Sequence, residues 1–203
     1  MPLATPSVVA PPAWYHPRGA RRARRLLPGH PACRVDHRQG ATYAVTAPDV
    51  PQDRTAEPRL VVREATTAAD LRAVMAIRAD VFIHEQHLTN VVDDDPYDAG
   101  SGAVVVLAWY GDRPVGTGRV HVWRGDAHIA WVAVLPAYRA RGVGREIMVA
   151  LLDAARELGA RRVTLSAQTH AIDFYRRLGF ETVGSLFVMG NIDHITMVRD
   201  LDV

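Results

Sequence analysis

The stretch LPAYRARGVGREIM, residues 135–148, decides how the centre of this chain folds. It opens with a leucine and a proline, and proline ends a preceding strand because it has no backbone N–H to donate to a sheet. Apolar residues at helical spacing follow its two glycines and predict a helix that begins at Val143. The apolar face of that helix is expected to hold Ile147, Leu151, Ala154 and Leu158, with Gly159 as its C-terminal stop.

This succession of strand, turn and helix also predicts an anion site. The first turn of a helix carries unpaired N–H groups and a partial positive charge, and glycine lets a ligand approach the backbone closely. Arginine side chains suit phosphate oxygens in charge and geometry. We therefore expect a diphosphate group across the helix start, held by Arg139, Ala140, Arg141, Gly142, Val143, Gly144 and Arg145. The same residues also fit a simpler interpretation, a solvated arginine-rich helix start that binds nothing.

The sequence excludes several common classes of site. The dinucleotide fingerprint needs a third glycine where this chain has Ile147, and the P-loop needs a lysine, which the chain lacks. No apolar run of about 18 residues predicts a membrane span. The single Cys33 allows neither an internal disulfide nor a cysteine zinc site. We expect a cytoplasmic protein that binds neither a membrane nor a metal.

The first 58 residues differ in composition from the rest of the chain. They hold ten of the thirteen prolines, and eight arginines against four acidic residues, whereas residues 59–203 hold sixteen arginines against eighteen acidic residues. Such a segment buries too little apolar surface to offset the entropy of ordering. We expect a disordered Pro/Arg-rich extension over residues 1–58 and one folded domain over 59–203. Only the arginine-rich tail suggests nucleic-acid binding, and the folded part does not share that feature.

The domain is expected to have the element order β-α-loop-β-β-β-α-β-α-β-β. Thr67 and Asp70 form the pattern of a capping box before the first helix. Short breakers such as GDRP and RGD separate three apolar strands and predict an antiparallel meander. The order predicts an α/β (α+β) fold with a mixed central sheet flanked by helices. The expected strands are 60–63, 103–110, 115–123, 127–135, 161–167, 181–188 and 194–198, and the last helix is 170–180.

Two motifs resemble those of a known family. Arg139, Gly142 and Gly144 after a strand resemble the acetyl-CoA-binding motif (Q/R-x-x-G-x-G/A) of the GNAT N-acetyltransferases. The later stretch AQTHAIDFYRRLGF, residues 167–180, is similar to the family's N-x-x-A-x-x-x-Y-x-x-x-G-F helix. The resemblance covers about residues 59–200 and implies the GNAT fold.

The ElaA-like subgroup of this family is the nearest match. The chain has VFIHEQ at 81–86, AQ-x-H-x-x-x-F-Y at 167–175 and NIDHITM at 191–197, each similar to a subgroup segment. It departs from the subgroup on the acceptor side, where Ala130, Trp131, Met189 and Asp193 replace the subgroup's residues. The departures leave the identity of the acceptor open.

The resemblance implies acetyl transfer from acetyl-CoA to an amine, on a small molecule or a peptide, by direct attack in a ternary complex. It implies that the backbone of Val132, Ala133 and Val134 pairs with the pantetheine arm, and that Gln168 joins the donor site. It implies Tyr175 as the acid for the leaving thiolate. The attacking amine must lose a proton, and Glu85 and His194 are the candidate bases. The expected acceptor contacts are Arg78, Glu85, Gln86, Asp95 and His194.

Each of these side chains also has a simpler interpretation. Tyr175 could be an aromatic at the edge of the core, Glu85 a solvated charge, and His194 a structural hydrogen-bonding group. At the level of the whole protein, a non-catalytic acyl-CoA sensor remains the alternative to an enzyme. The sequence is compatible with a monomer or a homodimer.

Overall fold

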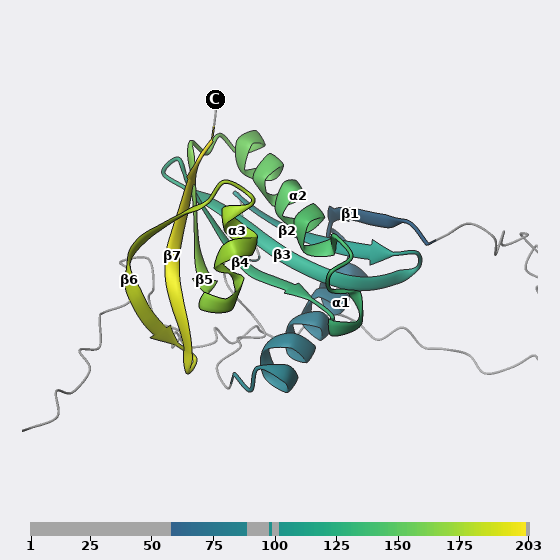
Figure 1. The fold of residues 1–203 in the computed structure, drawn as a ribbon. Helices are drawn as coiled ribbons and strands as arrows, with labels where there is room; N and C mark the ends of the chain where they lie inside the picture. The colour runs from purple at the N-terminus through teal and green to yellow at the C-terminus, as the bar shows by residue number, and fades with distance from the viewer. Residues whose placement is uncertain (1–57, 89–97, 99–101, 202–203) are drawn as a thin grey trace, which may run out of the picture. The chain divides into compact units, whose positions relative to one another are not determined.

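A seven-stranded β-sheet forms the centre of the computed structural model, which describes residues 58–88, 98 and 102–201 (Figure 1). The strand order is β1-β2-β3-β4-β5-β7-β6, and every neighbouring pair is antiparallel except β4 and β5, which run parallel. The predicted mixed sheet flanked by helices is confirmed. The strands are β1 (Leu60–Glu64), β2 (Ala103–Tyr110), β3 (Arg113–Trp123), β4 (Asp126–Val134), β5 (Arg162–Gln168), β6 (Glu181–Met189) and β7 (Ile192–Asp200).

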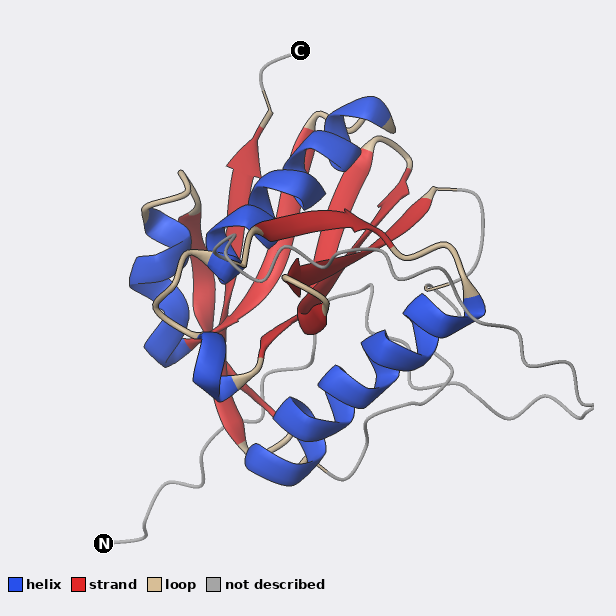
Figure 2. Ribbon diagram, turned by 90° about the vertical axis from the view of Figure 1, so that its right-hand side faces the viewer, coloured by secondary structure: helices blue, strands red, loops and turns tan. Residues whose placement is uncertain are grey.

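Helices cover both faces of this sheet and divide the core in two (Figure 2). On one face lie α1 (Ala68–Arg78) and the π-helix η1 (Ala79–Glu85) that continues it; on the other lie α2 (Val143–Glu157) and α3 (Ile172–Arg176). The larger apolar cluster lies under α2, and the smaller lies under α1. The two faces of the sheet therefore carry apolar cores of different size.

Helix α2 begins at Val143, as the sequence predicts. Its buried stripe includes Ile147 and Leu151, whose full burial stabilises the fold by about 1.5–3 kcal/mol each. The prediction was wrong for Leu158, which is 37% exposed because the helix ends one residue before it. The stripe instead continues through Met148, Leu152 and Ala155.

The helix predicted around residues 70–82 forms in two parts. Thr67 caps α1 with the expected capping box, and the helix changes from α to π geometry at Ala79. Val81 and Phe82 of the π segment are buried, so the apolar pattern was correct although the geometry was not foreseen.

The helix predicted over residues 170–180 is shorter than expected. A 3-10 turn, η3 (Thr169–Ala171), precedes the five residues of α3. Past α3, the amides of Leu178 and Gly179 donate to carbonyls three residues earlier, which tightens the chain. Gly179 has a φ of +82°, and the left-handed conformation ends the helical segment there.

A bulge in β4 divides this strand into two halves. Thr117 of β3 pairs with Ala133 and Arg119 pairs with Ala130, so two β4 residues lie opposite one β3 residue. Trp131 has a φ of +56° at this point, a conformation that favours glycine. The bulge reverses the alternation of side chains: Ile129 packs under α2, whereas Trp131 and Ala133 pack under α1.

Beyond the bulge, β4 and β5 separate. Their parallel pairing ends at Ile129 and Leu165, although the strands continue to Val134 and Gln168. This leaves a split in the sheet along the second half of β4.

The predictions for the N-terminal extension, 1–58, and for the loop that follows the first helix fall almost entirely outside the described residues. Among the residues that the structure does describe, no helix has the length and apolar character needed to cross a membrane.

Candidate active site

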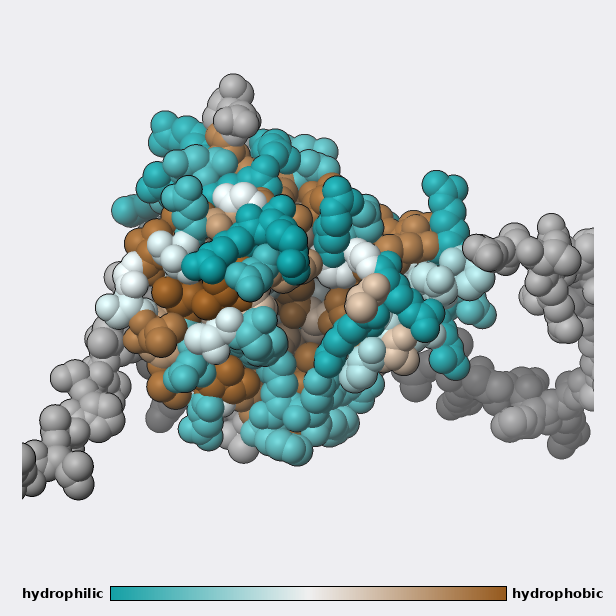
Figure 3. Space-filling model, viewed as in Figure 1, coloured by the Kyte–Doolittle hydropathy of each residue, from teal (hydrophilic) through white to brown (hydrophobic). Residues whose placement is uncertain are grey.

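The predicted anion site is an open helix start beside a hollow. Gly142 is the N-cap of α2, with a φ of +81°, and as a glycine it makes no side-chain cap hydrogen bond to this helix end. A Cβ at Gly142 would have no heavy atom within 4 Å, so the backbone faces open space. The hollow has a volume of about 450 Å³, and apolar atoms lie sunken among hydrophilic side chains on this face (Figure 3). Its lining includes Val134, Arg139, Ala140, Gly142, Gly144, Arg145, Phe174, Arg177 and Leu178.

The arginines of the loop have different surroundings. Arg141 lies between two tyrosine rings, with its guanidinium carbon 6.0 Å from the ring centre of Tyr110 and 5.8 Å from that of Tyr138. Arg145 pairs with its neighbour Glu146 at 2.8 Å and is largely exposed. Arg177, which was missed in the sequence, contributes a further cation to the hollow. Its signal was present: it is the second arginine of the YRRLGF segment, on the side of α3 that carries Phe174.

Arg139 is held by protein groups rather than left open for an anion. Its two terminal nitrogens donate to the Glu85 carboxylate at 2.7 and 2.6 Å, and its Nε donates to the Val134 carbonyl at 3.0 Å. The side chain therefore joins the end of η1 to the end of β4. The geometry favours a positioning role for Arg139 and leaves diphosphate contact to the backbone amides and the other arginines.

The same ion pair changes the expected role of Glu85. The hydrogen bonds from Arg139 lower the pKa of Glu85 below its ordinary 4.5. A carboxylate with a lowered pKa is a weaker base. Of the two candidate bases, Glu85 is thus the less suited to take a proton from an amine.

His194 has the geometry of a base. Its Nδ1 lies 2.8 Å from the Ile192 carbonyl. A carbonyl only accepts, so Nδ1 carries the hydrogen and Nε2 keeps its lone pair. Burial lowers the pKa of His194 below its ordinary 6.5, and the side chain is 4% exposed. The ring is therefore neutral near pH 7 and can accept a proton.

The structure brings the acceptor-side candidates together. In the β5–β7 ladder Gln168 lies opposite His194, so the two side chains share a face of the sheet. The Gln168 amide exchanges two hydrogen bonds with Gln86, at 3.0 and 3.3 Å. His170, at the turn after β5, is close enough to Glu85 and His194 to influence the pKa of each.

Tyr175 lies on the opposite face, half-buried against the core cluster under α2. Its ring contacts Phe174 and Phe180 at centroid distances of 5.0 and 6.0 Å. Burial raises the pKa of Tyr175 to about 12, which keeps the hydroxyl protonated at neutral pH. Phe174, its neighbour, lines the hollow.

Two predicted acceptor contacts have other surroundings. Arg78 is 1% exposed and forms a bidentate ion pair with Asp98, and its guanidinium lies 5.6 Å from the ring centre of Trp131. This burial argues against direct contact with an acceptor. Asp95 lies outside the described residues. Within residues 58–88, 98 and 102–201, no three His, Cys, Asp or Glu side chains cluster in a way that could hold a metal.

Known proteins are similar to this chain in sequence. Residues 64–201 match the family model described as the acetyltransferase (GNAT) domain. YjcF of Bacillus subtilis, an uncharacterized N-acetyltransferase, is 33% identical over 137 residues, which are 67% of this chain and 96% of that protein. Protein ElaA of Escherichia coli is 29% identical over 139 residues, 66% of this chain and 90% of ElaA.

Solved structures agree with these matches. The crystal structure of ElaA from Escherichia coli superposes with a TM-score of 0.64 at 25% identity, covering 70% of this chain and all of that one. An acyl-CoA N-acyltransferase from Pseudomonas aeruginosa superposes with a TM-score of 0.62 at 28% identity, covering 70% of this chain and 99% of that one.

Proposed function

Because this chain belongs to the GNAT acetyltransferases and resembles their ElaA-like members, we propose that it transfers an acetyl group from acetyl-CoA to an amine by direct attack in a ternary complex. The chain is an acyltransferase; the donor, the acceptor and the roles of the residues are the proposal. The observation that carries it is the uncapped start of α2 beside the hollow. Among residues of α2 and its N-cap, the first helical hydrogen bond runs from the Glu146 amide to the Gly142 carbonyl, so earlier amides remain available.

The residues of this site fit coenzyme A. The free amides at the start of α2 and the helix dipole suit a diphosphate, and Arg141, Arg145 and Arg177 bring positive charge to it. The apolar wall formed by Val134, Phe174 and Leu178 suits an alkyl arm. Beyond the bulge, the edge of β4 that faces β5 provides backbone groups that pair with none of the described strands. An extended amide-bearing arm can hydrogen-bond to that edge as an added strand does.

The thioester supplies an activated acyl carbon. On the acceptor side, His194 Nε2 takes a proton from the amine as the C–N bond forms. As the C–S bond breaks, the Tyr175 hydroxyl donates a hydrogen bond to the departing sulfur. With a pKa of about 12 the tyrosine does not give up its proton fully to a thiolate whose own pKa is about 8.5, so the thiolate is protonated later from water. The hydrogen-bond donor Tyr175 and the base His194 thus act from opposite faces of the sheet.

Isothermal titration with acetyl-CoA tests donor binding. We expect micromolar affinity, which is about 8 kcal/mol at 1 μM. No heat at high micromolar donor would contradict the proposal. Release of free CoA across a panel of amines would then identify the acceptor class, and binding without release for any amine would support a sensor instead.

The pH dependence of turnover tests His194. A base acts in its neutral form, so kcat/KM should fall as the pH drops through the lowered pKa of His194, below 6.5. His194→Gln should remove this acid limb and reduce kcat by about 100-fold or more. An unchanged acid limb in His194→Gln would assign the base elsewhere. Tyr175→Phe should reduce kcat while acetyl-CoA affinity stays near the wild-type value, and Tyr138→Phe serves as its control.

A further inference from the structure

Two consecutive residues tie together the strand ends on either side of the split. Glu85 binds Arg139, whose Nε holds the carbonyl at the end of β4, and Gln86 binds Gln168 at the end of β5. Gln86 and Gln168 form a reciprocal amide pair, which we call the glutamine bridge. It links the end of η1 to the end of β5. Its partner residues are 82 apart in the sequence, so the bridge is a feature of the folded state.

The glutamine bridge lies on the face opposite the hollow. Ala167 is buried in the core under α2, and since side chains alternate along a strand, Ser166 and Gln168 point to the α1 face. The hollow opens beside α2 and α3. A donor that enters from the hollow and passes through the split thus presents its acyl end to the bridge.

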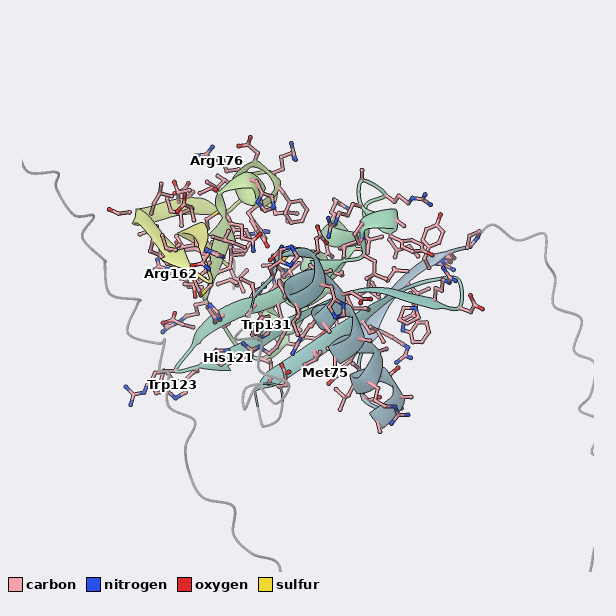
Figure 4. All side chains as sticks on the ribbon, turned by 90° about the horizontal axis from the view of Figure 1, so that it is seen from below. Met75, His121, Trp123, Trp131, Arg162 and Arg176 are labelled. Atoms are coloured by element: carbon pink, nitrogen blue, oxygen red, sulfur yellow. The ribbon has the colours of Figure 1, made fainter. Side chains whose placement is uncertain are left out.

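Bulky side chains also pack on the α1 face of the sheet. The rings of Phe82 and Trp131 meet edge to face at 5.2 Å, and Arg78 lies over Trp131. Figure 4, which views the sheet from below, shows Trp131 beside α1. These side chains belong to, or pack against, the smaller apolar cluster under α1.

A second observation points to a ligand beneath the bridge. The Ser166 hydroxyl oxygen is buried, and no group in the described part of the chain hydrogen-bonds to it. Ser166 is the first residue of β5 past its last pairing with β4. A buried hydroxyl without a partner is costly, and the carbonyl of a short acyl group, or a water held beside it, would satisfy it.

We propose that the glutamine bridge is the end wall of the acyl site and restricts the transferred group to short acyl chains. The inference rests on the proposed function, because it assumes that the donor passes through the split. Glu85 and Arg139 act as positioning residues, since they hold η1 where Gln86 can reach Gln168.

Calorimetry with acetyl-CoA and hexanoyl-CoA, in the absence of an acceptor, tests the wall without depending on turnover. Wild-type protein should bind acetyl-CoA at least about 10-fold more tightly than hexanoyl-CoA. Gln86→Ala and Gln168→Ala each open the wall from one side, and each should bring the two affinities to within about 3-fold. His84→Ala is the matched control, because His84 lies on η1 in an exposed pair with Asp80 and should keep the wild-type ratio.

The outcomes separate the two proposals. Equal affinities for both donors in the wild-type protein would overturn the wall and leave the acetyltransferase proposal standing. An unchanged ratio in both alanine variants, folded by circular dichroism, would overturn it as well. No heat with either donor would instead remove the proposed function, and the wall with it.

Discussion

Helices α1 and α2 differ at their N-termini: side chains cap the first turn of α1, whereas the N-cap of α2 has no side chain. At α1, Thr67 accepts from the Asp70 amide at 3.1 Å, and Asp70 accepts from the Thr67 amide at 3.2 Å. Arg63 then pairs with Asp70 at 2.7 Å. At α2, Gly142 brings no side chain to the helix end. One helix completes its first turn with its own residues, whereas the other leaves its first turn unfilled.

The difference separates a structural helix start from a binding one. A side-chain cap contributes about 1 kcal/mol to stability, and α2 forgoes it while α1 keeps it. Gly142, with its positive φ, and Gly144 both line the hollow at this helix start. The proposed site therefore depends on the missing side-chain cap of α2 as much as on the arginines around it.

Adding a charged side chain at the uncapped start of α2 should have the largest effect on acetyl-CoA affinity. Gly142→Asp places a carboxylate at the uncapped start of α2, where its negative charge would repel a diphosphate. We expect acetyl-CoA affinity to fall on the order of 100-fold, since a like charge at contact costs about 4 kcal/mol before screening. Calorimetry measures this loss, and thermal unfolding should show a modest loss of stability because any side chain at the positive φ of residue 142 is strained.

The matched control for this variant lies at the other end of the same helix. Gly159 has a φ of +77° and also has open space where a Cβ would be. Gly159→Asp should therefore introduce the same charge and a similar backbone strain without a change in affinity. Equal loss of affinity in both variants would mean that strain, and not the charge at the start of α2, weakens binding.

Removing a positive charge from the first turn of α2 should have an intermediate effect on acetyl-CoA affinity. Arg145→Ala is expected to weaken acetyl-CoA binding by about 10-fold at low salt, and by less at high salt as the charges are screened. Arg156 provides the comparison, because it is also paired with a nearby acid on α2, Asp153, at 2.8 Å, but lies at the far end. Similar losses for both arginines would indicate a general charge effect rather than a local contact.

Removing the side-chain cap of α1 should have the smallest effect, and it should change the stability of the protein rather than its affinity for acetyl-CoA. Thr67→Ala removes half of the capping box and should lower the free energy of unfolding by about 1 kcal/mol in urea titrations. Acetyl-CoA affinity should stay at the wild-type value. Weakened binding in this variant would show that the two helix starts are coupled.

Local patterns were enough to predict this contrast. Thr67 and Asp70 are three residues apart and form their cap within one turn, and Val143 follows Gly142, a residue that a helix interior would not favour. The meander of β2 to β4 followed from short turns between apolar runs. Each of these features is decided by residues close together in the chain.

Long-range contacts were not predictable in the same way. Glu85 and Arg139 are 54 residues apart, and nothing in either segment shows that each satisfies the other. Sequence analysis gave them separate roles, in acceptor and donor binding, whereas the structure makes them one ion pair. The faces of Phe174 and Tyr175 were also undecided, because adjacent helical residues point about 100° apart and only packing chooses between them.

The bulge at Trp131 makes β4 a locally frustrated strand. A tryptophan in the left-handed region costs on the order of 1–2 kcal/mol, and regular pairing with β3 and β5 would relieve that cost. Relief would also restore the alternation of side chains, move Ala133 into the other core and let β4 and β5 zip together to their ends. The positive φ of Trp131 and the separation of β4 from β5 therefore begin at the same place in the sheet.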